Sequence, residues 1–312
     1  MGISKTGYLL LNKKPGYSSF ESLFAVKKAF GTGKVCHTGT LDKFAAGLLV
    51  VLVGRAVKLS PWFSGCDKRY SGRIKIGEET DTLDPEGKVV AESAPCSREA
   101  FESALAAFRG EILQAPPEYS ALHINGIRAH LLARQGLGPK MEKRPVTIYS
   151  LNLVSWEPPF AGIDVHCSKG TYIRSLARDI ALAAGTRAHL SALTRTAVGG
   201  FLLEDAVSPP DAGRLEDGQM EDGQVEDGRE ARLERLEKAL APLDRELFRR
   251  LNIPSLEIGE KEAAAVSHGG SLRFLEERAV PSTVLALFHG ASLAAVTEKK
   301  DGVWGYGYVA GM

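Results

Sequence analysis

An aspartate inside a loop rich in Gly and Thr is the first candidate for chemistry in this chain. Asp42 lies in the stretch CHTGTLDKFAAGLLVVLVG, residues 36–54, between the polar loop and an apolar run. Polar loops held by a rigid neighbouring element often carry catalytic groups. An aspartate is ionised at neutral pH and can act as a nucleophile without an activating base. The alternative is an aspartate that caps a helix or closes a turn, the commoner role beside Thr and Gly.

Other sequence signatures of catalysis or cofactor binding do not fit. GTGK at 31–34 lacks the earlier Gly and the following Ser or Thr of a phosphate loop, and GYG at 305–307 precedes no helical pattern. The sequence contains no HExxH and no GxSxG. Its four cysteines form no CxxC pair, so we expect neither a disulfide framework nor a metal site. Chemistry without a cofactor is the better hypothesis.

Hydrophobic periodicity predicts the elements that must position Asp42. Short apolar or alternating runs indicate strands, helical spacing indicates helices, and Asp84-Pro85-Glu86-Gly87 indicates the turn of a hairpin. The expected strands lie at 8–12, 48–53, 69–76 and 163–167, and the expected helices at 18–30, 98–109, 171–184 and 231–241. Three further apolar runs, at 282–287, 292–297 and 303–309, predict a small C-terminal β domain.

Charge is unevenly distributed although the whole chain has a net charge of only +1. Residues 1–75 carry 13 Lys and Arg against 3 Asp and Glu, a net of +10, whereas residues 201–312 carry a net of −8. A basic front with an acidic rear is typical of proteins that bind a polyanion. Because Lys and Arg contacts to phosphate supply most non-specific nucleic-acid affinity, RNA or DNA is a candidate partner, but from charge alone a solvated basic face is the commoner explanation.

Six motifs resemble those of the TruB-type tRNA pseudouridine synthases and follow that family's order along residues 8–199. They are LLNKKPGYSS at 10–19, HTGTLD at 37–42, DKRY at 67–70, YSAL at 119–122 with ARQG at 133–136, CSKGTYIR at 167–174, and LTR at 193–195. The resemblance implies isomerisation of uridine to pseudouridine at position 55, in the T loop of tRNA, without cofactor or metal. It also implies an α+β fold around a mixed β-sheet, with flanking helices and a small C-terminal PUA-like β domain.

The same resemblance assigns roles to single residues. Asp42 becomes the catalytic nucleophile or base, Tyr70 stacks on the flipped uracil and helps to remove the C5 proton, and Arg174 pairs with Asp42. Five further residues are implied in substrate binding. Tyr172 and Leu193 line the uracil pocket, His37 contacts the T loop, and Lys13 or Lys14 braces the N-terminal motif against the catalytic loop or an RNA phosphate. Lys43 departs from the family, which usually has Pro after the aspartate, and so puts the loop geometry in question.

The chain divides into two expected domains. Residues 1–248 form the synthase domain and residues 249–312 the PUA-like domain, in which His268-Gly269-Gly270 is the most suggestive point of resemblance. Glu-Asp-Gly recurs at 216, 221 and 226, so residues 208–230 are interpreted as an acidic, low-complexity insertion with little apolar surface to bury.

Two alternative functions remain at this point. A non-catalytic RNA-binding or tRNA-folding module on the same fold would not need Asp42, Tyr70 and Arg174 together. A carboxylate glycosidase would need a second acid as proton donor, for which the basic surroundings offer no good candidate. The longest aliphatic run, residues 48–53, is far shorter than the roughly 18 apolar residues of a membrane span. No signal-peptide core precedes it, so we expect a cytoplasmic monomer with no membrane partner.

Overall fold

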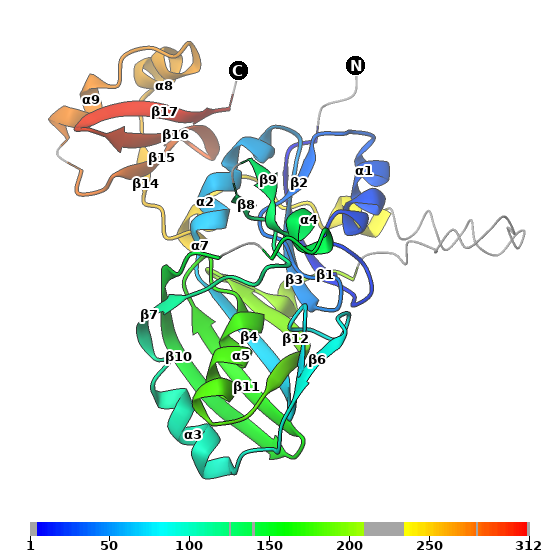
Figure 1. The fold of residues 1–312 in the computed structure, drawn as a ribbon. Helices are drawn as coiled ribbons and strands as arrows, with labels where there is room; N and C mark the ends of the chain where they lie inside the picture. The colour runs from blue at the N-terminus through cyan, green and yellow to red at the C-terminus, as the bar shows by residue number, and fades with distance from the viewer. Residues whose placement is uncertain (1–4, 125, 139–140, 209–233, 279, 311–312) are drawn as a thin grey trace, which may run out of the picture.

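A mixed β-sheet forms the centre of the computed structural model, which describes residues 5–124, 126–138, 141–208, 234–278 and 280–310 (Figure 1). Nine described strands belong to it: β1 (Gly7–Lys13), β2 (Val35–His37), β3 (Ala46–Val53), β4 (Lys68–Ile76), β7 (Gly110–Gln114), β10 (Arg144–Glu157), β11 (Phe160–Cys167), β12 (Ala188–Val198) and β13 (Phe201–Leu202). The main path is β1-β3-β12-β4-β11-β10-β7, with β2 paired to β3 and β13 to β12. The expected mixed sheet is confirmed, because β3 and β12 run parallel while the other pairs are antiparallel.

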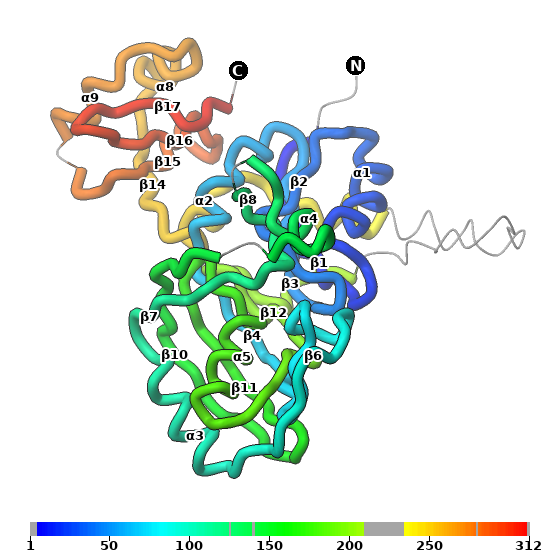
Figure 2. The backbone as a smooth tube through the Cα atoms, in the orientation of Figure 1, coloured from blue at the N-terminus to red at the C-terminus, as the bar shows by residue number. Residues whose placement is uncertain are grey.

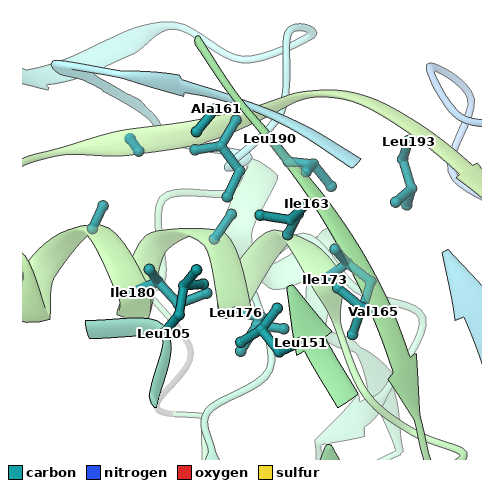
Figure 3. Close-up of a cluster of buried hydrophobic side chains, with 14 of the residues drawn as sticks. Leu105, Leu151, Ala161, Ile163, Val165, Ile173, Leu176, Ile180, Leu190 and Leu193 are labelled. Carbon is teal, nitrogen blue, oxygen red and sulfur yellow. The ribbon is translucent and has the colours of Figure 1, made fainter. Parts of the chain in front are cut away.

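The helices of the described residues accompany both the central sheet and a smaller C-terminal part of the molecule. They are α1 (Phe24–Phe30), α2 (Ser60–Gly65), α3 (Arg98–Ala106), α4 (Ala129–Arg134), α5 (Ile173–Ala183), α7 (Arg245–Arg250), α8 (Glu260–Ser267) and α9 (Arg273–Glu277), with 3-10 turns η1 (Glu21–Leu23), η2 (Gly54–Leu59) and η3 (Leu203–Asp205). Leu105 of α3 and Leu176 and Ile180 of α5 pack against Ile163 and Leu190 of the sheet (Figure 3). None of the described helices is both long and apolar enough to cross a membrane.

Most of the expected elements match the structure. The runs at 8–12, 48–53, 69–76 and 163–167 lie in β1, β3, β4 and β11, and the helices expected at 98–109 and 171–184 are α3 and α5. The turn at 84–87 connects the antiparallel strands β5 (Glu78–Thr80) and β6 (Val89–Glu92). The helix expected at 18–30 starts later, because residues 21–23 form a 3-10 turn before α1. Strands β10 and β12, the two longest of the central sheet, were not expected from the sequence.

A second sheet of four strands forms the C-terminal part of the molecule, as expected. It consists of β14 (Ser255–Glu257), β15 (Val284–His289), β16 (Ser292–Lys300) and β17 (Val303–Val309), and α8 and α9 accompany it. Three residues of this sheet, Phe288, Val296 and Tyr308, belong to one buried cluster with Leu59 of η2 and Phe63 of α2. Figure 2 shows this sheet beside α2. The domain boundary after residue 248 stays a prediction, and it falls inside α7. The acidic repeat of 208–230 lies outside the described residues from 209 onward.

Candidate active site

A cavity of about 810 Å³ lies where several segments distant in sequence meet, among them residues 119–121 and α4. Its walls come from the loop 38–43, the β5–β6 turn at 81–88 and the segment 168–174 that leads into α5. Tyr70 of β4 and Leu193 of β12 close it on the side of the sheet. The cavity contains Asp42, Tyr70, Tyr172, Arg174 and Leu193, so the structure brings together five of the eight residues singled out in the sequence.

Asp42 and Arg174 form the central pair of this cavity. Arg174 Nη2 donates to Asp42 Oδ1 at 3.1 Å, and Arg174 Nε lies 2.9 Å from Asp42 Oδ2. The two side chains differ in accessibility, because that of Arg174 is 5% exposed while that of Asp42 is 36% exposed. A fixed, buried guanidinium therefore orients a carboxylate that solvent, and hence a substrate, can reach.

Arg174 is itself held by groups other than Asp42. Its Nη1 lies 3.2 Å from Asp84 Oδ2 and donates to the carbonyl of Thr82 at 2.7 Å, and its Nη2 also donates to the carbonyl of Tyr119 at 3.0 Å. Asp84 is buried, and its Oδ1 accepts hydrogen bonds from the Thr82 hydroxyl and the Glu86 amide. The turn that the sequence predicted thus supplies a second carboxylate to the site.

Gln114 fixes the start of α5, the helix that carries Arg174. Its Oε1 accepts from the amide of Tyr172 at 2.8 Å, and its Nε2 donates to the carbonyl of the same residue at 3.1 Å. Because Gln114 is buried at the end of β7, these two bonds tie the helix start to the sheet. Arg174 therefore enters the cavity from a helix whose first turn is fixed, because both the amide and the carbonyl of Tyr172 are bonded to Gln114.

Arg195 anchors the loop 38–43, which carries Asp42 and is the catalytic loop expected from the sequence. It is 2% exposed, and its guanidinium donates to the carbonyls of Leu48 at 2.8 Å, Gly39 at 3.0 Å and Thr40 at 3.4 Å. The parallel pairing of Arg195 with Gly47 places it there, and a Cβ at Gly47 would lie 2.4 Å from the Arg195 carbonyl oxygen. Glycine is required at this position, since its φ of +104° is also a conformation that other residues rarely adopt.

Lys13 was expected to brace the N-terminal motif against either the catalytic loop or an RNA phosphate, and its position fits the first of these alternatives. The side chain is completely buried, and its ammonium donates to the carbonyls of Lys14, Tyr17, Lys43 and Ala45 at 2.5–3.3 Å. It therefore braces the N-terminal motif against the catalytic loop and cannot reach an RNA phosphate. Burial lowers the pKa of Lys13 to about 8, against the opposing effect of the Asp42 charge.

Lys43 stands where the family usually has Pro, but the backbone of the loop is still anchored at this residue. The carbonyl of Lys43 accepts from the amide of Gly16 at 2.8 Å as well as from Lys13. Ser19 adds a second anchor, because its hydroxyl accepts from the amide of Leu41 at 2.8 Å and donates to the carbonyl of the same residue at 3.0 Å. The N-terminal motif thus holds the residues on both sides of Asp42.

Tyr70 and Tyr172, two of the tyrosines that line the cavity, are neutral phenols at neutral pH. Burial raises the pKa of Tyr70, with Arg195 opposing the shift, and burial raises the pKa of Tyr172, with a hydrogen bond to Ser120 opposing it. Tyr70 packs at the edge of the main buried cluster, which also contains Leu193. Together they present aromatic and apolar surface to whatever occupies the cavity.

His37 and Lys14 do not line the cavity. His37 lies in β2, where burial and the nearby Arg195 lower its pKa, and its Nδ1 has no hydrogen-bond partner among the described residues. Lys14 is exposed on the loop beside the buried Lys13. A contact of either residue with RNA remains a prediction.

Sequence reasoning missed Asp84, Gln114 and the role of Arg195. Asp84 was assigned only to a turn, Gln114 stands in an unremarkable run, and Arg195 belonged to a motif without an assigned task. No local pattern could identify the first two, because their partners lie 58 or more positions away. No group of three or more His, Cys, Asp or Glu side chains that could hold a metal occurs within the described ranges.

Comparisons with known proteins agree with this arrangement. The family described as TruB family pseudouridylate synthase (N terminal domain) matches residues 27–173. The solved structure of a Cbf5-Nop10-Gar1 complex contains a chain with the same fold, at a TM-score of 0.67 and 23% identity over 97% of this chain and 83% of that one. Together with a relative at 37% identity over 94% of this chain, the family match places the protein in the class of the pseudouridine synthases, and the solved structure shows that the fold is shared.

Two relatives narrow the class to a family. The chain is 37% identical to tRNA pseudouridine synthase B of Actinobacillus pleuropneumoniae over 94% of this chain and 91% of the relative. It is 46% identical to the protein of the same name from Borreliella burgdorferi over 65% of this chain and 73% of the relative. The chain therefore belongs to the TruB family, as its six motifs indicated.

Proposed function

We propose that this protein isomerises uridine to pseudouridine at position 55, in the T loop of tRNA, with Asp42 as the catalytic nucleophile or base. The observation that carries the proposal is the accessible Asp42 carboxylate, fixed by the buried Arg174 in a cavity that also holds Tyr70 and Leu193. The relatives named tRNA pseudouridine synthase B support tRNA as the substrate.

The reaction leaves the composition of the nucleotide unchanged. The N1–C1′ glycosidic bond breaks, the uracil turns, a C5–C1′ bond forms, and the proton lost from C5 is balanced by one gained at N1. Asp42 attacks or deprotonates the nucleotide during this exchange. The target base must first leave its stack to enter the cavity, which costs a few kcal/mol and less in a loop than in a duplex.

The other cavity residues have roles that fit their surroundings. Tyr70 stacks on the flipped uracil, a role that a neutral phenol fulfils, whereas its raised pKa makes it a poor acceptor for the C5 proton in the resting enzyme. Tyr172 and Leu193 line the pocket for the base. One chain supplies every one of these groups, which supports a monomer, and the proposed substrate supports a cytoplasmic location.

The test compares the wild type with Asp42→Asn on unmodified tRNA and on a T-arm hairpin. Pseudouridine is mapped by a chemical adduct, and RNA affinity is measured separately. The amide keeps the size of the side chain but is neither nucleophile nor base, so product should fall by several powers of ten while affinity changes only a few-fold. A variant that keeps more than about a hundredth of the activity would refute the assignment. A wild type that binds tRNA without forming product would establish the RNA-binding alternative.

A further inference from the structure

Two phenylalanines, Phe20 just before η1 and Phe24 at the start of α1, each expose about half of their surface to solvent. Phe20 is 56% exposed and Phe24 is 50% exposed, and their ring centroids lie 5.4 Å apart at an interplanar angle of 80°. The inward side of the same segment is occupied by Leu23 and Val26, which are buried. The two rings therefore contribute little to the core, and adjacent exposed apolar rings indicate a binding partner.

The groups around these rings are mainly cationic. Lys27 Nζ lies 4.5 Å from the centroid of Phe20 and 6.0 Å from that of Phe24, and Lys28 is exposed on the next position. The one acidic side chain in this stretch, Glu21, accepts a hydrogen bond from the amide of Ser18. Aromatic rings surrounded by lysines suit nucleotides, whose bases stack on the rings while their phosphates meet the cations.

This surface is connected directly to the catalytic loop. Ser19, which precedes Phe20, exchanges two hydrogen bonds with Leu41, which precedes Asp42. The exposed Lys14 and Lys43 lie on the two segments that meet here, since the amide of Gly16 bonds to the carbonyl of Lys43. Figure 1 shows α1 beside β2, and Val26 of α1 packs with residues of β1 and β2.

We propose that Phe20, Phe24 and Lys27 form a stacking platform for an unpaired nucleotide of the RNA substrate. The platform binds a base other than the one that enters the cavity, and Lys27 carries the charge that meets the adjoining phosphate. The inference rests on the proposed function for the identity of the RNA. It assigns to α1 a part in substrate binding and none in the chemical step.

The test distinguishes binding by aromatic stacking from binding by apolar contact alone. Phe20→Leu/Phe24→Leu keeps apolar side chains but removes the aromatic faces, whereas Phe20→Trp keeps a face. Binding is measured by the fluorescence anisotropy of a labelled, unmodified T-arm hairpin, and KM and kcat by pseudouridine formation. The Leu double variant should raise Kd and KM roughly tenfold and leave kcat unchanged, and the Trp variant should bind as tightly as the wild type.

Tyr149→Leu is the matched control, because Tyr149 is also 56% exposed but lies in β10, outside the platform. It should leave Kd and KM unchanged. An affinity of the Leu double variant equal to that of the wild type would overturn the proposal. It would also be overturned if the wild type self-associated in sedimentation and the Leu double variant did not, because the occupant would then be a second copy of the chain. The binding arm does not depend on turnover, so an inactive wild type would refute the proposed function and still test the platform.

Discussion

At the scale of single residues, buried charges set the geometry of the site. Arg174 contacts two carboxylates and two carbonyls, Arg195 contacts three carbonyls, and Lys13 contacts four. A buried charge is tolerated only when its hydrogen-bonding groups are satisfied, so each of these side chains fixes the backbone around it. The two residue-scale predictions concern Lys13 and Asp84.

Lys13→Met should loosen the loop that carries Asp42, because the buried carbonyl of Ala45 loses its donor and the carbonyl of Lys43 keeps only the amide of Gly16. We expect a loss of about 2–4 kcal/mol in the free energy of unfolding, the usual size when buried polar groups lose a partner. Urea unfolding at pH 7 measures this loss. A stability equal to that of the wild type would show that Lys13 does not brace the loop.

The same variant predicts a pH dependence. The pKa of Lys13 is about 8 in the folded protein, against 10.5 for an ordinary lysine. Between these values the unfolded chain binds more protons than the native state, so stability rises with pH. Relative to Lys13→Met, the wild type should gain on the order of 3 kcal/mol at most from pH 8 to pH 10.5. Parallel stability curves for the two proteins over this range would exclude such a titration.

Asp84→Asn should slow the chemical step while leaving the fold of the β5–β6 turn largely intact. Its Oδ1 can still accept from Thr82 and Glu86, but the charge opposite Arg174 is lost. Arg174 then orients Asp42 less strictly, so the single-turnover rate at saturating tRNA should fall about 10–100-fold with KM nearly unchanged. A higher KM at an unchanged rate would instead assign Asp84 to substrate binding.

At the scale of elements, the parallel contact between β3 and β12 matters most. Only Ala46 and Gly47 of β3 pair with β12, at Thr194 and Arg195, yet this short contact places Arg195 under the catalytic loop. It also makes the sheet mixed, since the neighbouring pairs are antiparallel. The loop of Asp42 is therefore positioned by the pairing of two strands that lie about half the chain apart.

Gly47→Ala tests this contact. Because the new Cβ would lie 2.4 Å from the carbonyl oxygen and 2.7 Å from the amide nitrogen of Arg195, the strands must separate. We expect a loss of about 2–4 kcal/mol in stability and a lower kcat. Gly33→Ala is the control, since Gly33 has open space around it and should change stability by no more than about 0.5 kcal/mol. Equal stabilities for the two variants would show that the contact adapts.

At the scale of the whole molecule, the C-terminal sheet packs on the synthase part through η2 and α2. The indole of Trp62 lies over Gly307 of β17, and Arg55 donates to the carbonyl of Ala310 at 2.7 Å. On its other side, α2 contacts the catalytic loop, because the Ser64 hydroxyl donates to the carbonyl of Thr38 at 2.8 Å. One helix thus contacts both the C-terminal sheet and the wall of the cavity.

Gly307→Val should separate the two parts, since a Cβ there would lie 2.6 Å from the Trp62 ring. We expect Tm to fall by about 5–10 °C, as a loss of a few kcal/mol does in a chain of this size. Gly305→Val, two positions away on the same strand, is the control, because the nearest atom to its Cβ is 3.9 Å distant. Thermal melting followed by circular dichroism measures both, and a similar Tm for the two variants would contradict the packing described.

The sequence by itself indicated the family, most of the local elements around Asp42 and the small C-terminal sheet, and it singled out Asp42 as the candidate catalytic residue. These features are encoded locally, since a motif is a run of adjacent residues and a hydrophobic period reports one buried face. The sequence did not reveal β12, because its buried Arg195 and scattered polar residues obscure the alternation expected of a strand. Nor did it reveal that Lys13 is buried, because a lysine is ordinarily exposed.

Only the tertiary structure decided which groups meet. Arg174 reaches Asp42 and Asp84 across 132 and about 90 positions of sequence, and Gln114 reaches Tyr172 across 58. Such partners depend on strand order and on the packing of α5 against the sheet, which emerge from the sum of many long-range contacts. The residue types therefore indicated which chemistry to expect at the site, whereas the positions of these residues relative to one another depend on the tertiary fold.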